Sequence, residues 1–181
     1  MSQSTRDKLI ISAIKVFSEK GFYNTKVSDI VQEAGVAQGT FYIYFKSKEE
    51  IFLRIVQLIV SNMVGIIDKY SDVEDKPSKT IKLFARDIFK IMYEYKEIAY
   101  IFFFQVICVG SQFQDVYFDT SDKIKQFYLK KLESRPDKEI LSEILIGYGK
   151  RLVEFGMLRE NKPYLKIVDE FEKAVDLLIG D

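Results

Sequence analysis

Residues 35–50 read GVAQGTFYIYFKSKEE, and this stretch decides the fold. A tight connection that begins at Gly35 is followed by a helical pattern from Gln38 to Tyr44. Ser47 and Glu50 then have the spacing of a capping box, in which the serine bonds forward along the backbone and the glutamate reaches back. The stretch therefore predicts a short helix followed by a much longer one, which continues to about Tyr70.

Two further helical patterns precede this stretch. Apolar residues spaced three and four apart predict a helix from about Arg6 to Lys20, and Gly21 stands where that helix ends. Thr25 can cap a second helix of about two turns, which Gly35 ends. Two short helices joined by a tight glycine turn form the pattern of a helix-turn-helix.

The rest of the chain is also helical in pattern. The acidic segment 71–79 contains Pro77 and predicts a loop. No segment shows the alternation of apolar and polar residues that is typical of a half-buried β-strand. The predicted fold is all-α, with a three-helix head and about nine helices in all. Beyond the loop, five helices are predicted, at about residues 78–95, 97–109, 115–133, 137–158 and 164–179.

The third predicted helix has an outer face that suits a DNA major groove. On a helical wheel with about 100° per residue, Phe41 and Phe45 point together toward the core. Gly39 and Ile43 lie opposite them. Glycine allows the backbone to come close to the groove, and Ile43 could contact a thymine methyl group.

Polar groups surround this outer face. Gln38 could read an adenine edge, and the hydroxyls of Thr40 and Tyr42 could bond to the phosphates that border the groove. Taken singly, each residue is at least as well explained by an ordinary surface or capping role as by a DNA contact. The prediction of DNA binding therefore depends on their joint arrangement. Three more candidates lie near the N-termini of the second and fourth helices, where helix dipoles favour phosphate: Thr25, Lys26 and Lys48.

A set of residue types recurs at specific spacings in the first 50 residues: FSEKGF at 17–22, Thr25, Ile30, AGV at 34–36 and GTFYIYFKSKEE at 39–50. With these residues the first 50 positions resemble the head of the tetracycline-repressor (TetR) family. Ala37, where the family often has serine, and Ile43, at a position often polar or aromatic, depart from the pattern, so base preference cannot be carried over. The resemblance implies DNA contacts by Gln38, Gly39, Thr40, Tyr42, Tyr44 and Lys48.

The resemblance implies two domains. Residues 1–48 would form the DNA-binding domain, and residues 49–181 a helical ligand-binding and dimerisation domain, with the helix at about 48–70 connecting them. The charge distribution is consistent with a nucleic-acid contact in the head, because residues 1–48 carry a net charge of +3 and the remainder −3. One head reads few base pairs, so we expect a homodimer that binds double-stranded DNA at two half-sites arranged as a palindrome.

Family members typically dimerise through their last two long helices. Glycine costs about 1 kcal/mol relative to alanine within a helix, so the two glycines beside Tyr148 predict close helix contact. An intrachain core explains any one of the candidates about equally well. The candidate dimer residues are Ile144, Gly147, Tyr148, Arg151, Phe155, Phe171, Val175 and Leu178.

Aromatic residues are plentiful, with 15 Phe and 11 Tyr, and they gather between the head and the late helices. Residues 102–104 are three consecutive phenylalanines, more than one buried stripe needs. This surplus predicts a pocket for a hydrophobic small-molecule effector, such as a fatty-acyl or drug-like compound. The candidate lining residues are Phe84, Phe89, Met92, Tyr93, Phe103, Phe104, Tyr117 and Tyr128.

Composition argues against other functions. The chain has no histidine and one cysteine, Cys108, which excludes histidine-based catalysis and a disulfide framework and makes a metal site improbable. No phosphate-binding glycine loop is present, and no cofactor is predicted. The most apolar segment, 98–109, is interrupted by Gln105 and is shorter than the roughly 20 residues that cross a bilayer, so no membrane partner is expected.

The sequence therefore predicts a cytoplasmic, ligand-responsive DNA-binding regulator, a homodimeric repressor that a hydrophobic small molecule releases from its operator. A helical dimeric scaffold that binds a lipid or protein partner and has lost DNA binding stays open as the alternative. An all-helical enzyme lacks any visible catalytic set.

Overall fold

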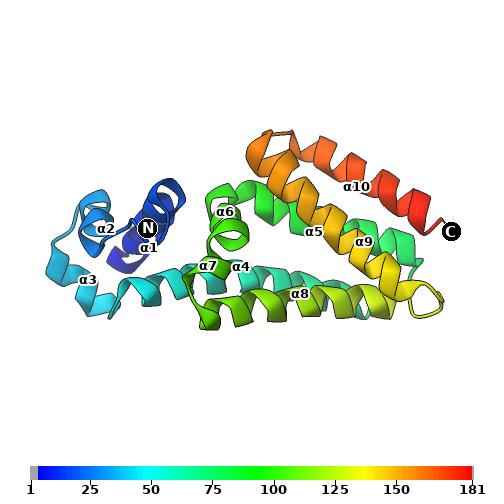
Figure 1. Ribbon diagram of the computed structural model, residues 1–181, viewed down its shortest axis with the longest axis horizontal. Coiled ribbons are helices and arrows are strands. Elements are labelled where there is room, and N and C mark those ends of the chain that lie inside the picture. Colours follow the sequence, from blue (N-terminus) through cyan, green and yellow to red (C-terminus); the bar gives the residue numbers. More distant parts are fainter. Residues whose placement is uncertain (1–3, 181) are drawn as a thin grey trace. The chain divides into compact units, whose positions relative to one another are not determined.

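The computed structural model describes residues 4–180, and within this range the chain forms helices and no strands (Figure 1). The all-α prediction is confirmed; residues 1–3 and 181, the outer ends of the two predicted domains, lie outside the described residues. The elements are α1 (Thr5–Lys20), α2 (Val27–Ala34), α3 (Gln38–Tyr44), α4 (Lys48–Ser71), α5 (Pro77–Glu94), α6 (Lys96–Phe104), α7 (Val106–Val109), α8 (Ser111–Lys131), α9 (Lys138–Arg151), the π-helix η1 (Leu152–Arg159) and α10 (Tyr164–Leu178).

Two of the predicted helices differ from the observed ones. The helix predicted over 97–109 is divided into α6 and α7, because Gln105 leaves regular helical geometry between them, at φ −116° and ψ −38°. The helix predicted over 137–158 begins as α9 and continues as the wider π-helix η1. Both differences lie in the part of the chain that follows the head.

The capping box before α4 forms in a modified version. The Glu50 N–H donates to Ser47 Oγ at 3.3 Å, as the spacing predicts. The Glu50 carboxylate does not reach back to Ser47; it accepts from the Lys46 N–H at 2.6 Å. The start of α4 is therefore held by two side-chain bonds, in the way that helix N-termini require.

The chain folds into two compact units, and these do not follow the order of the sequence. The first contains Met1–Val60 and Glu97–Tyr117; the second contains Ser61–Lys96 and Phe118–Asp181. Helices α6 and α7 thus share a unit with α1, α2 and α3, so that this unit includes more of the chain than the predicted head.

Aromatic and aliphatic side chains form the core of the first unit. Phe17 on α1 lies edge-on to Phe52 on α4, with ring centroids 5.1 Å apart, and Phe52 meets Phe113 on α8 at 5.4 Å. Helix α4 is apolar and long enough to cross a bilayer by length and composition alone. Its residues Ile51 and Ile55 are buried in the protein, as is 39% of its most apolar stretch.

In the second unit, α10 packs along α5. Phe89 and Phe171 meet edge-on at 5.3 Å between these helices. Arg86 pairs with Glu172, and a second ion pair, Lys82 with Asp176, lies further along the same two helices. The apolar contact is the main source of stability here, because surface ion pairs contribute at most about 1 kcal/mol each.

Candidate nucleic-acid interface

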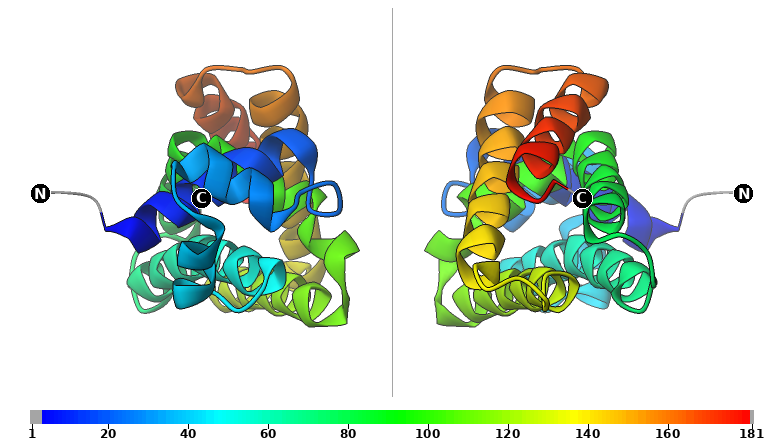
Figure 2. Two further views of the ribbon diagram at one scale, coloured as in Figure 1. Left: turned by 90° about the vertical axis from the view of Figure 1, so that its left-hand side faces the viewer. Right: turned by 90° about the vertical axis from the view of Figure 1, so that its right-hand side faces the viewer.

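Helices α2 and α3 form the predicted helix-turn-helix (Figure 2). Gly35 adopts a left-handed conformation, with φ 66° and ψ 36°, which glycine adopts without the steric cost that a Cβ imposes. Its N–H and that of Val36 donate to the last carbonyls of α2, the latter to Val31 O at 3.0 Å. These bonds end α2 and turn the chain into α3.

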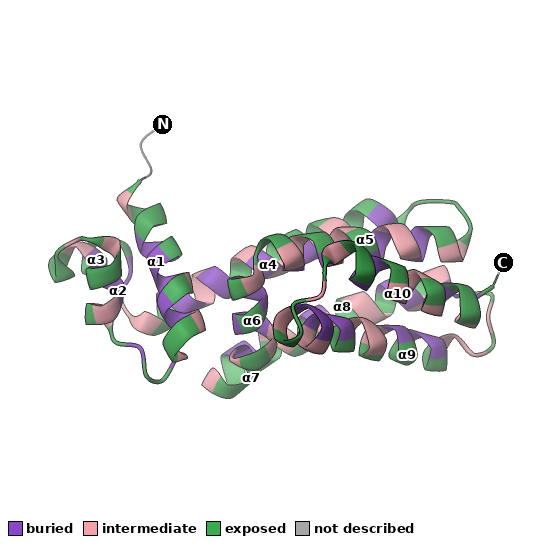
Figure 3. Ribbon diagram, turned by 90° about the horizontal axis from the view of Figure 1, so that it is seen from above, coloured by how far each residue is buried: buried purple, intermediate pink, exposed green. Residues whose placement is uncertain are grey.

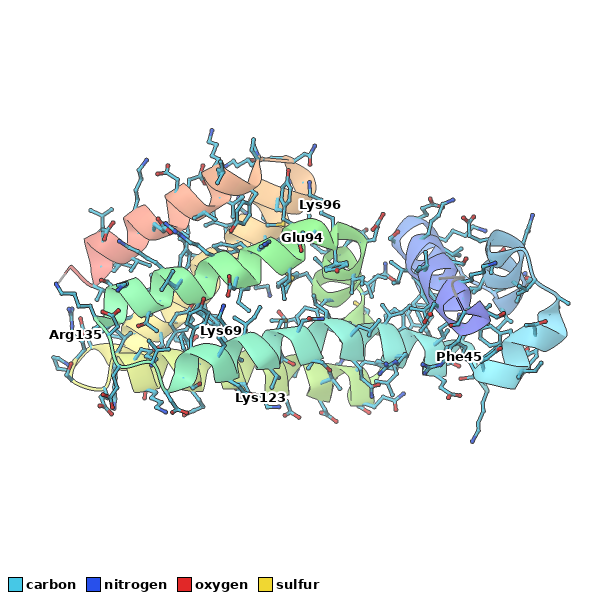
Figure 4. All side chains as sticks on the ribbon, turned by 180° about the vertical axis from the view of Figure 1, so that it is seen from behind. Phe45, Lys69, Glu94, Lys96, Lys123 and Arg135 are labelled. Atoms are coloured by element: carbon cyan, nitrogen blue, oxygen red, sulfur yellow. The ribbon has the colours of Figure 1, made fainter. Side chains whose placement is uncertain are left out.

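The wheel prediction for α3 is confirmed by burial. Phe41 is 0% exposed and Phe45, labelled in Figure 4, is also buried, with the two ring centroids 5.8 Å apart. Ile43 on the opposite side is 76% exposed, and Tyr42 is exposed as well. Figure 3 accordingly shows α3 mostly in the exposed and intermediate colours. An exposed aliphatic side chain between exposed aromatic rings forms an apolar surface patch, which favours a contact with a partner.

The structure brings most of the predicted DNA-binding residues together on α3. Gly39 is notable among them, because a Cβ at this position would meet nothing within 4 Å. No packing inside the chain therefore requires a glycine there, although glycine costs about 1 kcal/mol in a helix. A close approach by an external partner would explain it. Exposed on α3 are Gln38, Gly39, Tyr42, Ile43 and Tyr44, and Thr40 is half-buried.

Thr25 and Lys48 have internal roles. Thr25 is buried and its hydroxyl donates to Gly21 O at 2.7 Å, so it does not cap α2; Lys26 takes that position. The ammonium of Lys48 donates to Phe22 O at 2.8 Å and to Thr25 O at 2.9 Å. The structure thus directs both side chains to the connection between α1 and α2, and their contacts with phosphate stay predictions.

Two ion pairs join α1 to α2. Lys15 lies 2.6 Å from Glu33, and this carboxylate raises the pKa of Lys15 above its ordinary value. Lys20 lies 3.1 Å from Asp29. The carboxylate of Asp29 also accepts the Lys26 N–H at 2.8 Å, and these bonds lower the pKa of Asp29. The N-terminal turn of α2 is therefore capped by its own acidic residue.

Two cations near the helix-turn-helix form no close ion pair within residues 4–180. Lys26 and Lys46 are exposed, and neither ammonium forms an ion pair with a residue that the structure describes. Lys46 lies two residues after the end of α3 and was not among the predicted site residues. Its signal in the sequence is a basic residue placed between the third helix and the capping box of the fourth. Unpaired lysines are suited to phosphate contacts.

The predicted effector residues are divided between the two units. Phe84 is buried and stacks on Phe127 with ring centroids 4.1 Å apart, and it lies edge-on to Tyr128. Burial raises the pKa of the Tyr128 hydroxyl. One helical turn before Phe84, the Thr80 hydroxyl is buried without a hydrogen-bond partner among the described residues, a feature that the sequence did not reveal. The second unit holds Phe84, Phe89, Met92, Tyr93 and Tyr128; the first holds Phe103, Phe104 and Tyr117.

The predicted dimer residues differ in exposure. Phe171 and Val175 are buried in the interior of the chain, because α10 turns this side toward α5, as the contact of Phe171 with Phe89 shows. Tyr148, Phe155 and Leu178 are half-buried. Ile140, on the exposed stripe of α9, was not among the predicted dimer residues. The stripe contains both charged and apolar residues: Glu139, Ile140, Glu143, Ile144, Gly147, Lys150 and Arg151.

Sequence comparisons cover both parts of the chain. Residues 79–178 match the family described as tetracyclin repressor-like, C-terminal domain, and residues 9–55 match the bacterial regulatory proteins of the tetR family. The HTH-type transcriptional regulator YdgC of Bacillus subtilis (strain 168) is 29% identical to this chain, in a match that covers 97% of this chain and 91% of that protein. These relatives are transcriptional regulators and not enzymes.

Solved structures with the same fold include two informative examples. A transcriptional regulator of the TerR/AcrR family from Aquifex aeolicus VF5 is 26% identical and covers 97% of this chain and 100% of its own, with a TM-score of 0.82. The regulator FadR from Bacillus subtilis, solved in complex with stearoyl-CoA, is 19% identical and covers 96% of this chain and 97% of its own, with a TM-score of 0.72.

Proposed function

Since the chain belongs to the TetR family of bacterial transcriptional regulators, we propose that it is a cytoplasmic homodimeric repressor that a hydrophobic small molecule releases from its operator. The observation that carries the proposal is the outer face of α3. There, Gly39 and the exposed Ile43 lie between polar and aromatic side chains, with Lys46 close by in the sequence.

The proposed contacts have distinct roles. Gln38 and Ile43 would read base edges, the first by hydrogen bonds to adenine and the second by contact with a thymine methyl group. Tyr42, Tyr44 and Lys46 would hold the phosphates on either side and set the register. Such phosphate contacts release counterions, so operator affinity must fall steeply with salt.

The exposed stripe on α9 is the proposed dimer face. Ile140 is 65% exposed and Ile144 follows one turn later, with Gly147 next along the same side. Isolated exposed apolar residues are ordinary, but a helical stripe of them favours an interface with a partner helix. A second copy placed there would supply the second head that a two-half-site operator requires.

The effector is proposed to be hydrophobic, with a long-chain acyl compound as the first candidate. The support is the aromatic core of the second unit around Phe84 and the unpartnered Thr80 hydroxyl near it. The stearoyl-CoA complex of the similarly folded FadR adds a reason to begin with acyl-CoA. Repression would be relieved by linkage, because a ligand that prefers the conformation with low DNA affinity lowers DNA binding by the same coupling factor.

Binding of selected DNA over a salt series tests the function. A duplex selected from a random pool should bind far more tightly than unselected duplex, and affinity should fall by about a thousandfold between roughly 50 and 200 mM salt. The double variant Thr40→Ala/Tyr42→Ala should lose this binding, whereas Tyr95→Ala, which removes an exposed tyrosine of the second unit, should keep it. If no selected sequence binds better than random duplex, the regulator hypothesis is wrong, and the alternative of a helical scaffold without DNA binding takes its place.

A further inference from the structure

The connection between α1 and α2 is held by a residue from far along the chain. Gln105 is separated from Phe22 by 83 positions and lies at the break between α6 and α7, yet both belong to the first compact unit. It also falls in the segment 79–178 that matches the C-terminal family model. The C-terminal part of the sequence therefore has a direct contact with the helix-turn-helix part.

The Gln105 amide uses both of its ends in this contact. Its Nε2 donates to Phe17 O at 2.8 Å, in the last turn of α1. Its Oε1 accepts from the Phe22 N–H at 3.0 Å, immediately after Gly21 ends that helix. The amide supplies a donor at one end and an acceptor at the other at every pH, whereas a carboxyl group of the same length loses its donor when it ionises. The side chain thus bridges the two sides of the turn that follows α1.

Phe22 receives further contacts from its other sides. Its carbonyl accepts from Lys48, whose ammonium also lies 4.3 Å from the centre of the Phe22 ring. Its ring packs against Phe52 with centroids 4.8 Å apart. The next residue, Tyr23, donates its hydroxyl to Cys108 O on α7 at 2.7 Å. The short connection that leads to α2 is therefore held by α4 on one side and by the α6–α7 segment on the other.

We propose that Gln105 is a positioning residue for operator binding: its amide fixes the α1–α2 connection, and with it the N-terminal end of α2, in the arrangement that DNA binding needs. Any movement of the α6–α7 segment that withdraws this amide would lower DNA affinity without touching a DNA-contacting residue. The inference rests on the proposed function and adds the residue through which the C-terminal part of the sequence acts on it.

A change of Gln105 to Glu provides a reversible test. The carboxylate can still accept from the Phe22 N–H, but it has no proton for Phe17 O and places a negative oxygen against that carbonyl. Operator affinity near pH 7.5 should fall by at least about tenfold, equivalent to about 1.4 kcal/mol. A part-buried carboxylate facing the Phe17 carbonyl should have a pKa above the ordinary glutamate value of about 4.3, because burial and the carbonyl disfavour its charge. Protonation restores the missing donor, so the affinity ratio to the wild type should begin to recover as the pH is lowered toward about 5.5.

The absence of histidine makes this readout clean. No histidine in the chain titrates between about pH 5.5 and 8, so wild-type affinity should change little over that range. Gln105→Met keeps the length of the side chain and removes both hydrogen bonds, and its loss of affinity should not recover with pH. Gln114→Glu is the matched control, since the Gln114 side-chain amide donates to Ile107 O at 2.8 Å, seven residues away and outside the α1–α2 connection.

Thermal unfolding is measured first, and affinities are compared well below each midpoint. If Gln105→Met does not fold, the pH series of Gln105→Glu still decides the question within one protein. Wild-type affinity in both Gln105 variants, or an equal pH response in Gln114→Glu, would overturn the inference and leave the DNA-binding function intact. Failure of the wild type to prefer any selected DNA would remove the proposed function and the inference together.

Discussion

Alanine at Gly156 tests how closely η1 packs on α10. A Cβ built on Gly156 would lie 2.7 Å from Cδ1 of Ile167, whereas carbon atoms in contact are normally about 3.5–4.0 Å apart. Ile167 is fully buried, so its terminal methyl group cannot swing into solvent. The Gly156 carbonyl also accepts the Lys162 N–H at 2.8 Å, which restrains the backbone from moving away.

The expected effect is a net loss of stability. Overpacking of this kind costs about 1–3 kcal/mol, and replacing a helical glycine by alanine returns at most about 1 kcal/mol. Gly156→Ala should therefore destabilise the protein by about 1 kcal/mol or more, a fall in Tm of about 2–4 °C per kcal/mol for a chain of this size. Gly65→Ala is the matched control, because a Cβ there meets nothing within 4 Å, and it should be neutral or stabilising.

A double-mutant cycle identifies the atom responsible. Ile167→Val removes the Cδ1 methyl group and alone should cost about 0.5–1.5 kcal/mol. Combined with Gly156→Ala it should cost much less, because the added Cβ then fills the space that Cδ1 has left. Unfolding is followed by circular dichroism at equal protein concentration, since a dimer's midpoint depends on concentration. Additive effects, or a Gly156→Ala variant as stable as Gly65→Ala, would refute the packing argument.

Three further predictions concern a charge, a base contact and the dimer face. Asp87 is partly buried, which acts to raise the pKa of its carboxyl, but the bonds from Lys69 at 2.7 Å and Tyr70 at 2.9 Å outweigh this and lower it. The stability that these bonds contribute is present above about pH 4 and is lost as the pH falls through the lowered pKa. In urea titrations, the free energies of unfolding of wild type and Asp87→Asn should therefore differ by up to about 1 kcal/mol at pH 7 and converge in acid. At one position in each half-site, replacing thymine by uracil should weaken wild-type binding by about 1 kcal/mol, because the methyl group that Ile43 would contact is removed. Fluorescence anisotropy should show no such loss for Ile43→Ala, and an equal loss in both proteins would exclude this contact. Ile144→Glu should raise the dimer dissociation constant by tenfold or more in analytical ultracentrifugation, since it would bury a carboxylate in the proposed interface, whereas an unchanged constant would place the interface elsewhere.

The head was predictable because its signals are local. The orientation of α3 depends only on its periodicity, so Phe41 and Phe45 could be assigned to the core and Ile43 to the surface before the fold was known. The end of α2 at Gly35 depends on a left-handed conformation that glycine favours, and this too is a property of one residue. In such cases the neighbours along the chain provide most of the interaction that decides the structure.

Other assignments depended on partners distant in sequence. Thr25 and Lys48 had the composition of phosphate contacts, and only the folded chain shows that both bind backbone groups between α1 and α2. Phe171 and Val175 had the pattern of an interface stripe but lie inside the chain. An apolar pattern indicates that a side chain is buried, but it does not indicate whether the same chain or a partner subunit covers that side chain.

The sequence by itself therefore determined the all-helical fold, the helix-turn-helix and the outward face of α3, because helix formation and its ends are decided by periodicity and by residues a few positions apart. The tertiary structure alone decided that Gln105, at the break between α6 and α7, bonds to both sides of the turn after α1, and that a Cβ at Gly156 would crowd Ile167. Both depend on atoms that become neighbours only when distant segments pack together, and no local pattern contains that information.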